Sequence, residues 1–232
     1  MQWVMNMNFR SASDRMLIAC DFDGTLYHDG SVSVAAIKAL KRAREQGHVT
    51  GIVSGNTIEN INRRCDLSSS IDFIASSNGA VVSFGDGSIE LAKGDPVLMA
   101  RIGSECERMY GSRLSNIVMN DHTAGFITRD NDLQDKINEL IANRFRIDTS
   151  RWSSGVSAVL IQKDRALAHI REMICKNGRI LCIGDSENDI PMLDYAHNSG
   201  GLSALVGNSN LTYYADIRAQ RPYGDGVAEI IE

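Results

Sequence analysis

The chain has 232 residues, of which 43% are hydrophobic and 23% are charged, and its formal net charge is −5. This composition is typical of an ordinary soluble globular protein, and the length allows one substantial domain or a core domain with a smaller insert. The acidic balance argues against a nucleic-acid partner and against binding to an anionic membrane surface. It does not exclude a small anionic ligand, because a few local cations can hold one.

Cysteine usage and the lack of long apolar segments predict a cytoplasmic protein. The five cysteines are scattered without a CxxC pair, so we expect reduced thiols with no metal or redox role; they are Cys20, Cys65, Cys106, Cys175 and Cys182. No segment approaches the ~18 to 20 apolar residues of a membrane span. Residues 1–15 lack the apolar region of a secretory signal, so we expect a loose extension, and Met16 would serve equally well as a first residue. The sequence leaves a homodimer open.

The first part of the chain alternates short apolar strands with amphipathic helices. Three segments are apolar without alternation, which is typical of parallel strands buried on both faces; they are Met16–Cys20, Val49–Val53 and residues 73–75. Ser33 is suited to begin the helix after the first strand, and a shorter helix is predicted from about Thr57.

The middle of the chain changes to pairs of strands separated by helices. Turn signals at residues 78–79 and 85–87 predict a hairpin of strands at 80–84 and 88–91. A helix, two strands, a second helix and two further strands follow, with expected ranges of 96–110, 115–120, 125–128, 132–143, 146–152 and 156–162. Nothing in this order indicates parallel crossovers, so we expect antiparallel strands with helices on one side, a small α+β layer.

From Lys163 onward the alternation of helix and buried strand returns. We expect a helix that ends at Gly178, and then a strand, a helix, a strand and a final helix at residues 180–183, 191–196, 202–206 and 227–231. The sequence therefore predicts a doubly wound α/β fold with a parallel sheet. Residues 15–84 and 162–232 would form this core, and residues 85–161 would form an inserted cap.

The most specific feature is DFDGT at residues 21–25, directly after the first predicted strand. Ligands of open parallel sheets bind at the carboxyl ends of the strands. Asp21 could attack a phosphorus atom and form an aspartyl-phosphate, while Asp23 donates a proton to the leaving oxygen. Gly24 permits the tight turn that this arrangement needs. The alternative is an acidic turn that merely ends a strand.

A second acidic loop, GDSEND at residues 184–189, also follows a buried strand. Carboxylates gathered at one sheet edge repel each other unless a cation lies among them, and oxygen ligands suit Mg²⁺. We therefore predict Mg²⁺ ligation by Asp21 and Asp185, with the main-chain carbonyl of Asp23 as a third ligand. Asp189 would orient the loop from behind the ligands. A loop that only caps the next helix is compatible with this hypothesis.

Two further positions could bind a phosphate group. Ser54 and Gly55 end the second strand and offer a hydroxyl and open main-chain N–H groups at a helix start, although such a pair usually only caps a helix. Lys163 lies where the predicted cap rejoins the core. It could neutralise the phosphate, although a lone lysine at such a junction is more often solvated.

Taken together, these signals resemble the haloacid dehalogenase (HAD) superfamily of phosphatases over nearly the whole core. They are DFDGT, VSGN at 53–56, the lysine in IQKD, and GDSEND followed by Ile-Pro-Met. The resemblance implies a Rossmann-like core, and the insert is similar to the smallest version of the C2B cap. SGNTIENI, SSNGAVVSFGDGSIE, GDSENDIPM and PYGDGVAEI look similar to archaeal-type phosphoglycolate phosphatases. Cof-like sugar phosphatases, sucrose-phosphate phosphatases and phosphomannomutases are broader relatives.

The resemblance implies a role for each matching position. Asp21 would be the nucleophile and Asp23 the general acid and then base, Asp185 the second Mg²⁺ carboxylate, and Ser54, Lys163 and Asn188 phosphate ligands. Asn208 matches a position near the lysine. Two positions depart from the pattern: Asp164 stands where glycine usually follows the lysine, and Asn56 replaces an arginine common in Cof-like members. The second departure favours the phosphoglycolate branch.

The expected function is hydrolysis of a small phosphorylated metabolite, with 2-phosphoglycolate first and small sugar phosphates next. A phosphomutase on the same scaffold is one alternative, although the cap shows no obvious arginine cluster for a bisphosphate. A catalytically silent phosphate-binding or regulatory protein is the other. The cap side chains that could contact substrate are Arg113, His122, Arg129, Arg151 and Trp152.

Overall fold

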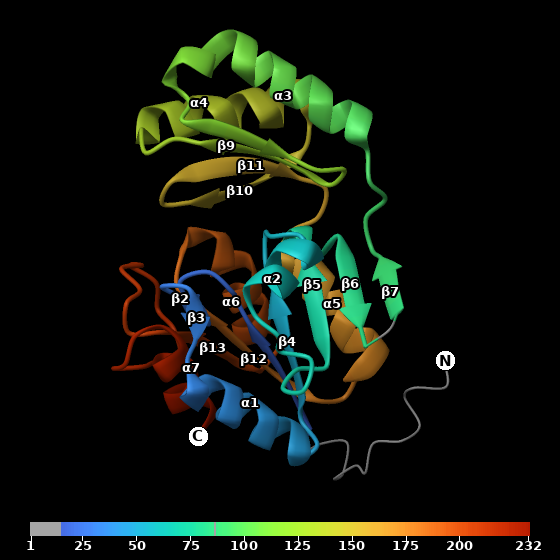
Figure 1. Ribbon diagram of the computed structural model, residues 1–232, viewed down its shortest axis with the longest axis vertical. Coiled ribbons are helices and arrows are strands. Elements are labelled where there is room, and N and C mark those ends of the chain that lie inside the picture. Colours follow the sequence, from blue (N-terminus) through green and yellow to red (C-terminus); the bar gives the residue numbers. More distant parts are fainter. Residues whose placement is uncertain (1–14, 86) are drawn as a thin grey trace.

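A computed structural model describes residues 15–85 and 87–232 of the chain. These residues form two layers, each built on its own sheet (Figure 1). The expectation that residues 1–15 form a loose extension falls outside the described residues, except for Arg15. No helix within the described ranges is long and apolar enough to cross a membrane.

The larger sheet has eight strands, of which six are parallel. Their spatial order is β14 (Ile217–Arg218), β13 (Leu202–Leu205), β12 (Arg179–Gly184), β1 (Met16–Cys20), β4 (Val49–Val53), β5 (Phe73–Ser76), β6 (Val81–Phe84) and β7 (Gly87–Glu90). At one edge β6 pairs antiparallel with both β5 and β7, whereas all pairs from β14 to β5 are parallel. This mixed sheet with helices on both faces confirms the predicted doubly wound α/β fold.

Helices cover both faces of the larger sheet because successive strand side chains point to opposite sides. Leu17 and Ala19 of β1 pack in the cluster that contains α5 (Lys163–Ile174) and α6 (Ile190–Asn198). Ile18 and Cys20 pack in the cluster that contains α1 (Val34–Glu45), α2 (Ile58–Arg64) and α7 (Tyr223–Ile231). A strand buried on both faces needs no polar alternation, which is what its sequence shows.

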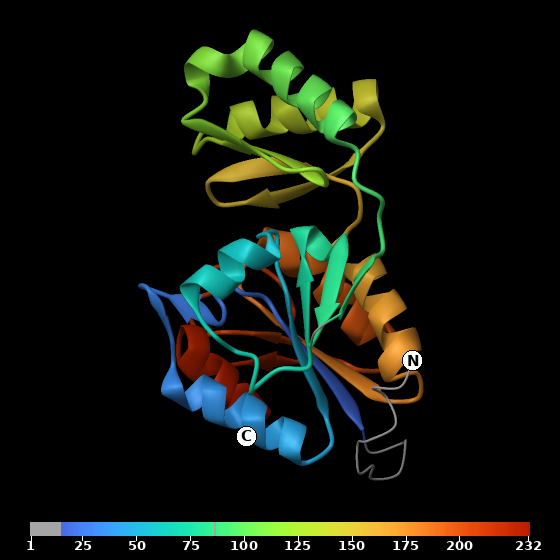
Figure 2. The ribbon, with the colours of Figure 1, turned by 45° about the vertical axis from the view of Figure 1, so that its right-hand side comes forward.

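The smaller layer consists of residues 96–159. Its four strands are antiparallel in the order β10 (Asp148–Trp152), β11 (Gly155–Val159), β9 (Thr123–Ile127) and β8 (Asn116–Met119). The helices α3 (Pro96–Tyr110) and α4 (Asn131–Leu140) cover the sheet face turned away from the larger layer (Figures 1 and 2). Leu133, Ile137, Phe126 and Met99 belong to an apolar cluster whose members all come from this layer or its flanks.

The smaller layer lies over the edge of the larger sheet at which the parallel strands end, and β10 faces that edge (Figure 1). The strand β10 contacts the 3-10 turn η6 (Glu187–Asp189), which directly follows β12. Two chain segments connect the layers. In one, Glu90 accepts hydrogen bonds from Gly94 N and pairs with His122, and in the other Gln162 Nε2 donates to Thr149 O at 2.6 Å.

Most predicted elements lie within a few residues of their expected positions. Ser33 and Thr57 cap α1 and α2 through their side-chain oxygens, as expected for these residue types. The predicted insert begins at residue 85, whereas β7 pairs with β6 in the larger sheet. Residues 87–90 therefore belong to the larger sheet, because the hairpin's ladder continues outward from β5.

Several elements differ from the sequence-based expectation in extent. The helix α5 ends at Ile174, before Gly178, and α4 continues as a π-helical turn, Ile141–Phe145. The helix α7 begins at Tyr223 although Gly224 and Gly226 are poor helix formers. A Cβ on Gly224 would lie 3.1 Å from Leu26 O, so glycine allows this helix to approach the loop after β1 closely.

Separate apolar clusters in the two layers predict separable local stability. We expect Leu133→Ala, which opens a cavity inside the smaller layer, to cost about 2–5 kcal/mol of unfolding free energy. Hydrogen exchange should then accelerate mainly in residues 96–159. The matched change Ile52→Ala lies in the larger layer and should accelerate exchange there instead. Equal acceleration of both layers by both variants would contradict this separation.

Candidate active site

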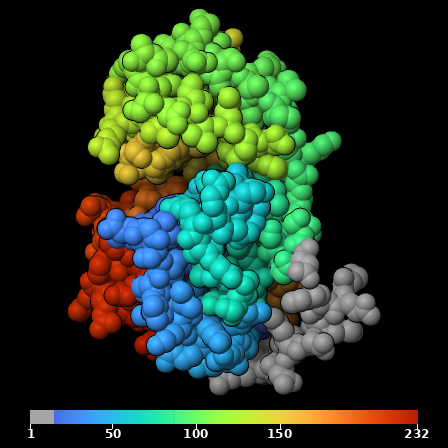
Figure 3. Space-filling model, viewed as in Figure 1, coloured from blue at the N-terminus to red at the C-terminus, as the bar shows by residue number. Residues whose placement is uncertain are grey.

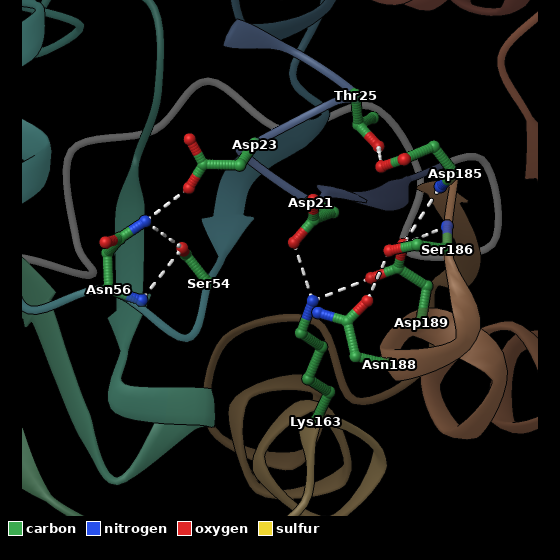
Figure 4. A network of polar contacts seen from close by, with 10 residues as sticks. All are labelled: Asp21, Asp23, Thr25, Ser54, Asn56, Lys163, Asp185, Ser186, Asn188 and Asp189. Carbon is green, nitrogen blue, oxygen red and sulfur yellow. Dashed lines mark hydrogen bonds and ion pairs between the residues drawn. The ribbon is translucent and has the colours of Figure 1, made fainter. Parts of the chain in front are cut away.

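Asp21 lies at the carboxyl end of β1 and is only 3% exposed. Its backbone N donates to Ile183 O at 2.8 Å, which continues the parallel pairing with β12 past the last strand residue. The Nζ of Lys163, at the start of α5, donates to Asp21 Oδ1 at 2.6 Å and to Asp189 Oδ1 at 2.6 Å (Figure 4). The predicted lysine is therefore fully buried between two carboxylates rather than solvated.

Asp189 organises the loop after β12. Its second oxygen, Oδ2, accepts hydrogen bonds from the backbone N of Asp185 at 2.9 Å and of Ser186 at 3.0 Å. Both Asp189 oxygens are thus occupied, one by Lys163 and the other by the backbone of the loop. A Cβ on Gly184 would lie 2.6 Å from Asp189 Cβ, so only glycine lets this side chain fold back under the loop.

Asp185 faces Asp21 from the neighbouring strand end. Its Oδ1 accepts a hydrogen bond from Thr25 Oγ1 at 2.7 Å, and its main-chain oxygen accepts from Ser209 Oγ at 2.7 Å. Gly24 has φ of 83°, and a Cβ there would lie 2.6 Å from Asp185 Oδ2. Glycine at this position meets two requirements, the left-handed turn and the close approach of the carboxylate.

The carboxylates outnumber the cations at this sheet edge. Oxygens of Asp21, Asp185 and Asp189 lie within 4.8 Å of one another. Burial, with the nearby Asp189 and Asp185, raises the pKa of Asp21 well above its ordinary value despite Lys163. Burial and Asp189 raise the pKa of Asp185 to about 6. Burial alone would lower the pKa of Lys163, but Asp189 and Asp21 together raise it.

These properties fit a hard divalent cation. Asp185 Oδ2 accepts no hydrogen bond from the described residues, and Asp21 Oδ1 accepts only the one from Lys163, so each has a lone pair available for ligation while Asp21 Oδ2 stays free. A cation between them would relieve the repulsion that raises both pKa values, and oxygen-only donors favour hard ions. Asp189 is less available because both of its oxygens already accept hydrogen bonds.

Asp23 lies on the opposite side of Asp21 from this acidic cluster, and its side chain is held from α2 and its preceding loop (Figure 4). Arg64 Nη2 donates to Asp23 Oδ1 at 2.5 Å, and Asn56 Nδ2 donates to Asp23 Oδ2. The Arg64 guanidinium also lies 4.0 Å from the centroid of the Tyr27 ring. The Asp23 side chain remains 48% exposed, so it can meet a ligand and water.

Ser54 and Gly55 follow β4 on the same edge. The Oγ of Ser54 accepts from Asn56 N at 3.1 Å, which leaves its own hydroxyl proton available to a ligand. The N–H of Gly55 donates to no partner among the described residues. This pair of donors, the anion cradle, could hold an anionic group beside Asp23 and Asp21.

The last two predicted residues differ in their contacts. Asn188 Oδ1 accepts from Ser186 Oγ at 2.5 Å, and its side chain lies beside Lys163 (Figure 4). Asn208 contacts the loop after β1 instead of Lys163: its Nδ2 donates to Gly24 O at 3.0 Å and its Oδ1 accepts from Tyr223 N at 2.7 Å. It supports the turn that carries the two aspartates.

Sequence reasoning did not single out four polar residues that complete the site: Thr25, Arg64, Ser186 and Ser209. Thr25 and Ser186 lie inside the two acidic segments, so the aspartates beside them could have identified them as site residues. Arg64 and Ser209 reach the site only through the packing of α2 and of the segment after β13, and no local pattern marks them.

Comparisons with known proteins show which proteins this chain is similar to. A family model described as haloacid dehalogenase-like hydrolase matches residues 18–94 and 107–231. A phosphoglycolate phosphatase from Methanospirillum hungatei is 25% identical over 223 residues, covering 92% of this chain and 94% of that protein. One from Archaeoglobus fulgidus is 24% identical over 217 residues, with 93% and 95% coverage.

Solved structures show the same fold. A phosphatase of the HAD superfamily from Bacteroides thetaiotaomicron has a TM-score of 0.74 at 21% identity and covers 95% of each chain. A haloacid dehalogenase-like hydrolase from B. subtilis has a TM-score of 0.76 at 16% identity, with 93% of this chain and 98% of that chain covered. The resemblance predicted from the sequence is confirmed, and the chain belongs to the haloacid dehalogenase-like hydrolase family.

Proposed function

We propose that the protein is a magnesium-dependent phosphatase that transfers a phosphoryl group to Asp21 and then to water. The observation that carries this proposal is the buried Asp21 carboxylate, which has one oxygen held by Lys163 and the other free. Held in this way, the carboxylate is oriented for attack without moving. The anion cradle of Ser54 and Gly55 lies on the same edge to receive the transferred group.

In the first step, the free oxygen of Asp21 attacks phosphorus and the ester oxygen leaves. The Nζ of Lys163, the hydroxyl of Ser54 and the amide of Asn188 stabilise the charge on the non-bridging phosphoryl oxygens. Asp23 gives a proton to the leaving alkoxide. Arg64 and Asn56 hold the Asp23 carboxyl group beside the anion cradle, near the phosphoryl group that the cradle would bind.

In the second step, water attacks the aspartyl-phosphate. Asp23, now ionised, removes a proton from this water, and phosphate leaves with Asp21 restored. The exposure of Asp23 suits this second role because water reaches it directly. The Asp21 Oδ1 that Lys163 holds keeps the carboxyl group fixed through both steps.

The oxygens of Asp21 and Asp185, with the main-chain oxygen of Asp23, would hold the Mg²⁺. When bound, the ion supplies positive charge that neutralises the carboxylates and screens the substrate phosphate. Thr25 and the turn at Gly24 hold Asp185 in place for this ligation. Asp189 keeps the loop in shape by using both of its oxygens on Lys163 and the backbone.

We propose 2-phosphoglycolate as the substrate, with small sugar phosphates next. The relatives named as phosphoglycolate phosphatases match along nearly their whole length. A cavity of about 530 Å³ lies between the two layers, with walls from β10, η6 and residues 210–212. This cavity is large enough for a small phosphate ester, and one of the proposed phosphate ligands, Asn188, lies on its wall.

The acidic cluster predicts a strict metal requirement. EDTA should abolish hydrolysis of a phosphate ester, and added Mg²⁺ should restore it, because the carboxylates otherwise repel the incoming phosphate. A colorimetric phosphate assay before and after chelation measures this. Undiminished turnover in excess chelator would contradict the assigned ligands.

Metal binding should also depend on pH in a defined direction. Without metal, the folded protein holds the Asp185 proton more tightly than the unfolded chain does, because folding raises this pKa from 3.8 to about 6. This preference stabilises the fold fully below pH 3.8 and is lost as the pH rises through about 6. Mg²⁺ should therefore raise the melting temperature by roughly 3 to 6 °C at about pH 7.5 and by much less at about pH 5. Asp185→Asn should remove this difference. An equal shift at both pH values would contradict Mg²⁺ ligation by Asp185.

The two aspartates of DFDGT should respond differently to amide substitution. Asp21→Asn removes the attacking oxygen, so activity should fall at least about a thousandfold, roughly 4 kcal/mol of barrier. Asp23→Asn keeps the nucleophile but lacks a base for the second step. With p-nitrophenyl phosphate, whose leaving group needs little protonation, phospho-enzyme should accumulate in Asp23→Asn alone.

Intact mass after rapid quenching measures this difference as one added phosphoryl group, about 80 Da. Peptide mapping should place the group on Asp21. Equal labelling of both variants, or a phosphoryl group on a serine, cysteine or histidine, would remove Asp21 from the proposed role.

A further inference from the structure

The cavity between the layers adjoins the candidate active site. Asn188 lies on its wall and also beside Lys163 (Figure 4). The opposite wall comes from the smaller layer through Thr149, Ser150 and Arg151 of β10. Figure 3 shows the surface hollowed where the gold strands of the smaller layer meet the red C-terminal segment. A small ester with its phosphate on Lys163 would therefore extend toward β10.

Arg151 is the one positively charged side chain among the described residues that line this cavity. None of the other four candidate side chains lines this cavity. Arg113 pairs with Asp130 and Asp132, His122 pairs with Glu90 beside the connecting segment, and Trp152 donates to Ser154 Oγ. Arg129 does not line the cavity. The structure thus reduces five candidates to one.

The guanidinium of Arg151 has donors to spare. Its Nη1 donates to Asp135, whereas Nη2 lies 3.5 Å from Asn131 Oδ1 and Nε lies 3.5 Å from Glu187 Oε2. Contacts of 3.5 Å are at the outer limit of hydrogen bonding. Glu187 and Asp135 are 57% and 62% exposed, so these ion pairs are screened by water and can be exchanged at little cost.

The cavity would repel a second anionic group of the substrate without this arginine. Glu187 carries a negative charge on the same wall as Asn188, and it lies in the same loop as Asp185 and Asp189 of the acidic cluster. An arginine fork matches a carboxylate in a paired arrangement of two N–H donors. Arg151 therefore favours an ester whose tail ends in a carboxylate over one whose tail is uncharged.

We infer that Arg151 determines specificity by binding the carboxylate of a phosphorylated carboxylic acid, in exchange for its contact with Glu187. This inference rests on the proposed phosphatase function and adds the residue that reads the substrate's tail. The simpler reading is that Arg151 only fastens the smaller layer to the larger one through Glu187. The two hypotheses predict that substitution of Arg151 affects different substrates.

The test compares 2-phosphoglycolate with ethyl phosphate, in which a methyl group replaces the carboxylate. Arg151→Gln should lower kcat/KM for 2-phosphoglycolate by about 10- to 100-fold, mainly through KM, and for ethyl phosphate by less than about threefold. Arg151→Lys should recover part of the loss, because it keeps the charge without the fork. Arg113→Gln replaces an arginine of the same layer that lies away from the cavity. It is the matched control and should leave kcat/KM unchanged for both esters.

Glu187→Gln separates binding from fastening. If Glu187 competes with the substrate carboxylate, this variant should keep or lower the KM for 2-phosphoglycolate. If the pair only fastens the layers, Glu187→Gln should resemble Arg151→Gln on both esters, which would overturn the inference. Equal losses on both esters in Arg151→Gln would also overturn it.

The wild-type enzyme distinguishes this inference from the proposed function. If the wild type hydrolyses ethyl phosphate with the same kcat/KM as 2-phosphoglycolate, the inferred role of Arg151 is wrong, but the proposed phosphatase function stands. A wild type that hydrolyses neither ester, nor p-nitrophenyl phosphate, removes the proposed function together with the inference.

Discussion

The buried ion network of Lys163 with Asp21 and Asp189 is the interaction on which the rest of the site depends. It joins the end of β1, the start of α5 and the loop after β12, which are 142 and 26 residues apart in sequence. A buried ammonium is tolerated only when it is paired and hydrogen-bonded, and loss of one partner of such a pair costs about 3–5 kcal/mol. The network therefore fixes the position of α5, and with it the connection to the smaller layer, at the sheet edge.

The same network leaves an excess of negative charge that the protein does not neutralise with its own side chains. Lys163 offsets one carboxylate of three, and the pKa values of Asp21 and Asp185 are raised. Close backbone approaches at Gly24 and Gly184 press these carboxylates together, against their mutual repulsion. A cation bound among these carboxylates would relieve their repulsion and stabilise the folded protein. The crowding of negative charge therefore accounts both for the raised pKa values and for the proposed Mg²⁺ site.

The two layers divide the work of the proposed reaction. The larger layer supplies every group proposed to touch the phosphoryl group, whereas the smaller layer has its own apolar cluster and faces the cavity with Arg151. Because the contact between Arg151 and Glu187 is exposed and long, the layers are held together there only weakly. Such a contact can be exchanged for substrate without disturbing the buried Lys163 network.

Local residue chemistry determined much of the fold and the core of the candidate site. Short apolar segments such as Val49–Val53 are typical of buried strands, and Ser33 and Thr57 are strong helix caps. Acidic segments directly after parallel strands meet at one sheet edge. Only tertiary structure decided which distant side chains reach that edge. Arg64 contacts Asp23, Asn208 supports Gly24 rather than Lys163, β7 joins the larger sheet, and Arg151 alone of five candidates faces the cavity. The physical reason is that caps, turns and buried strands depend on neighbours within a few residues, whereas these contacts depend on how whole helices and layers pack.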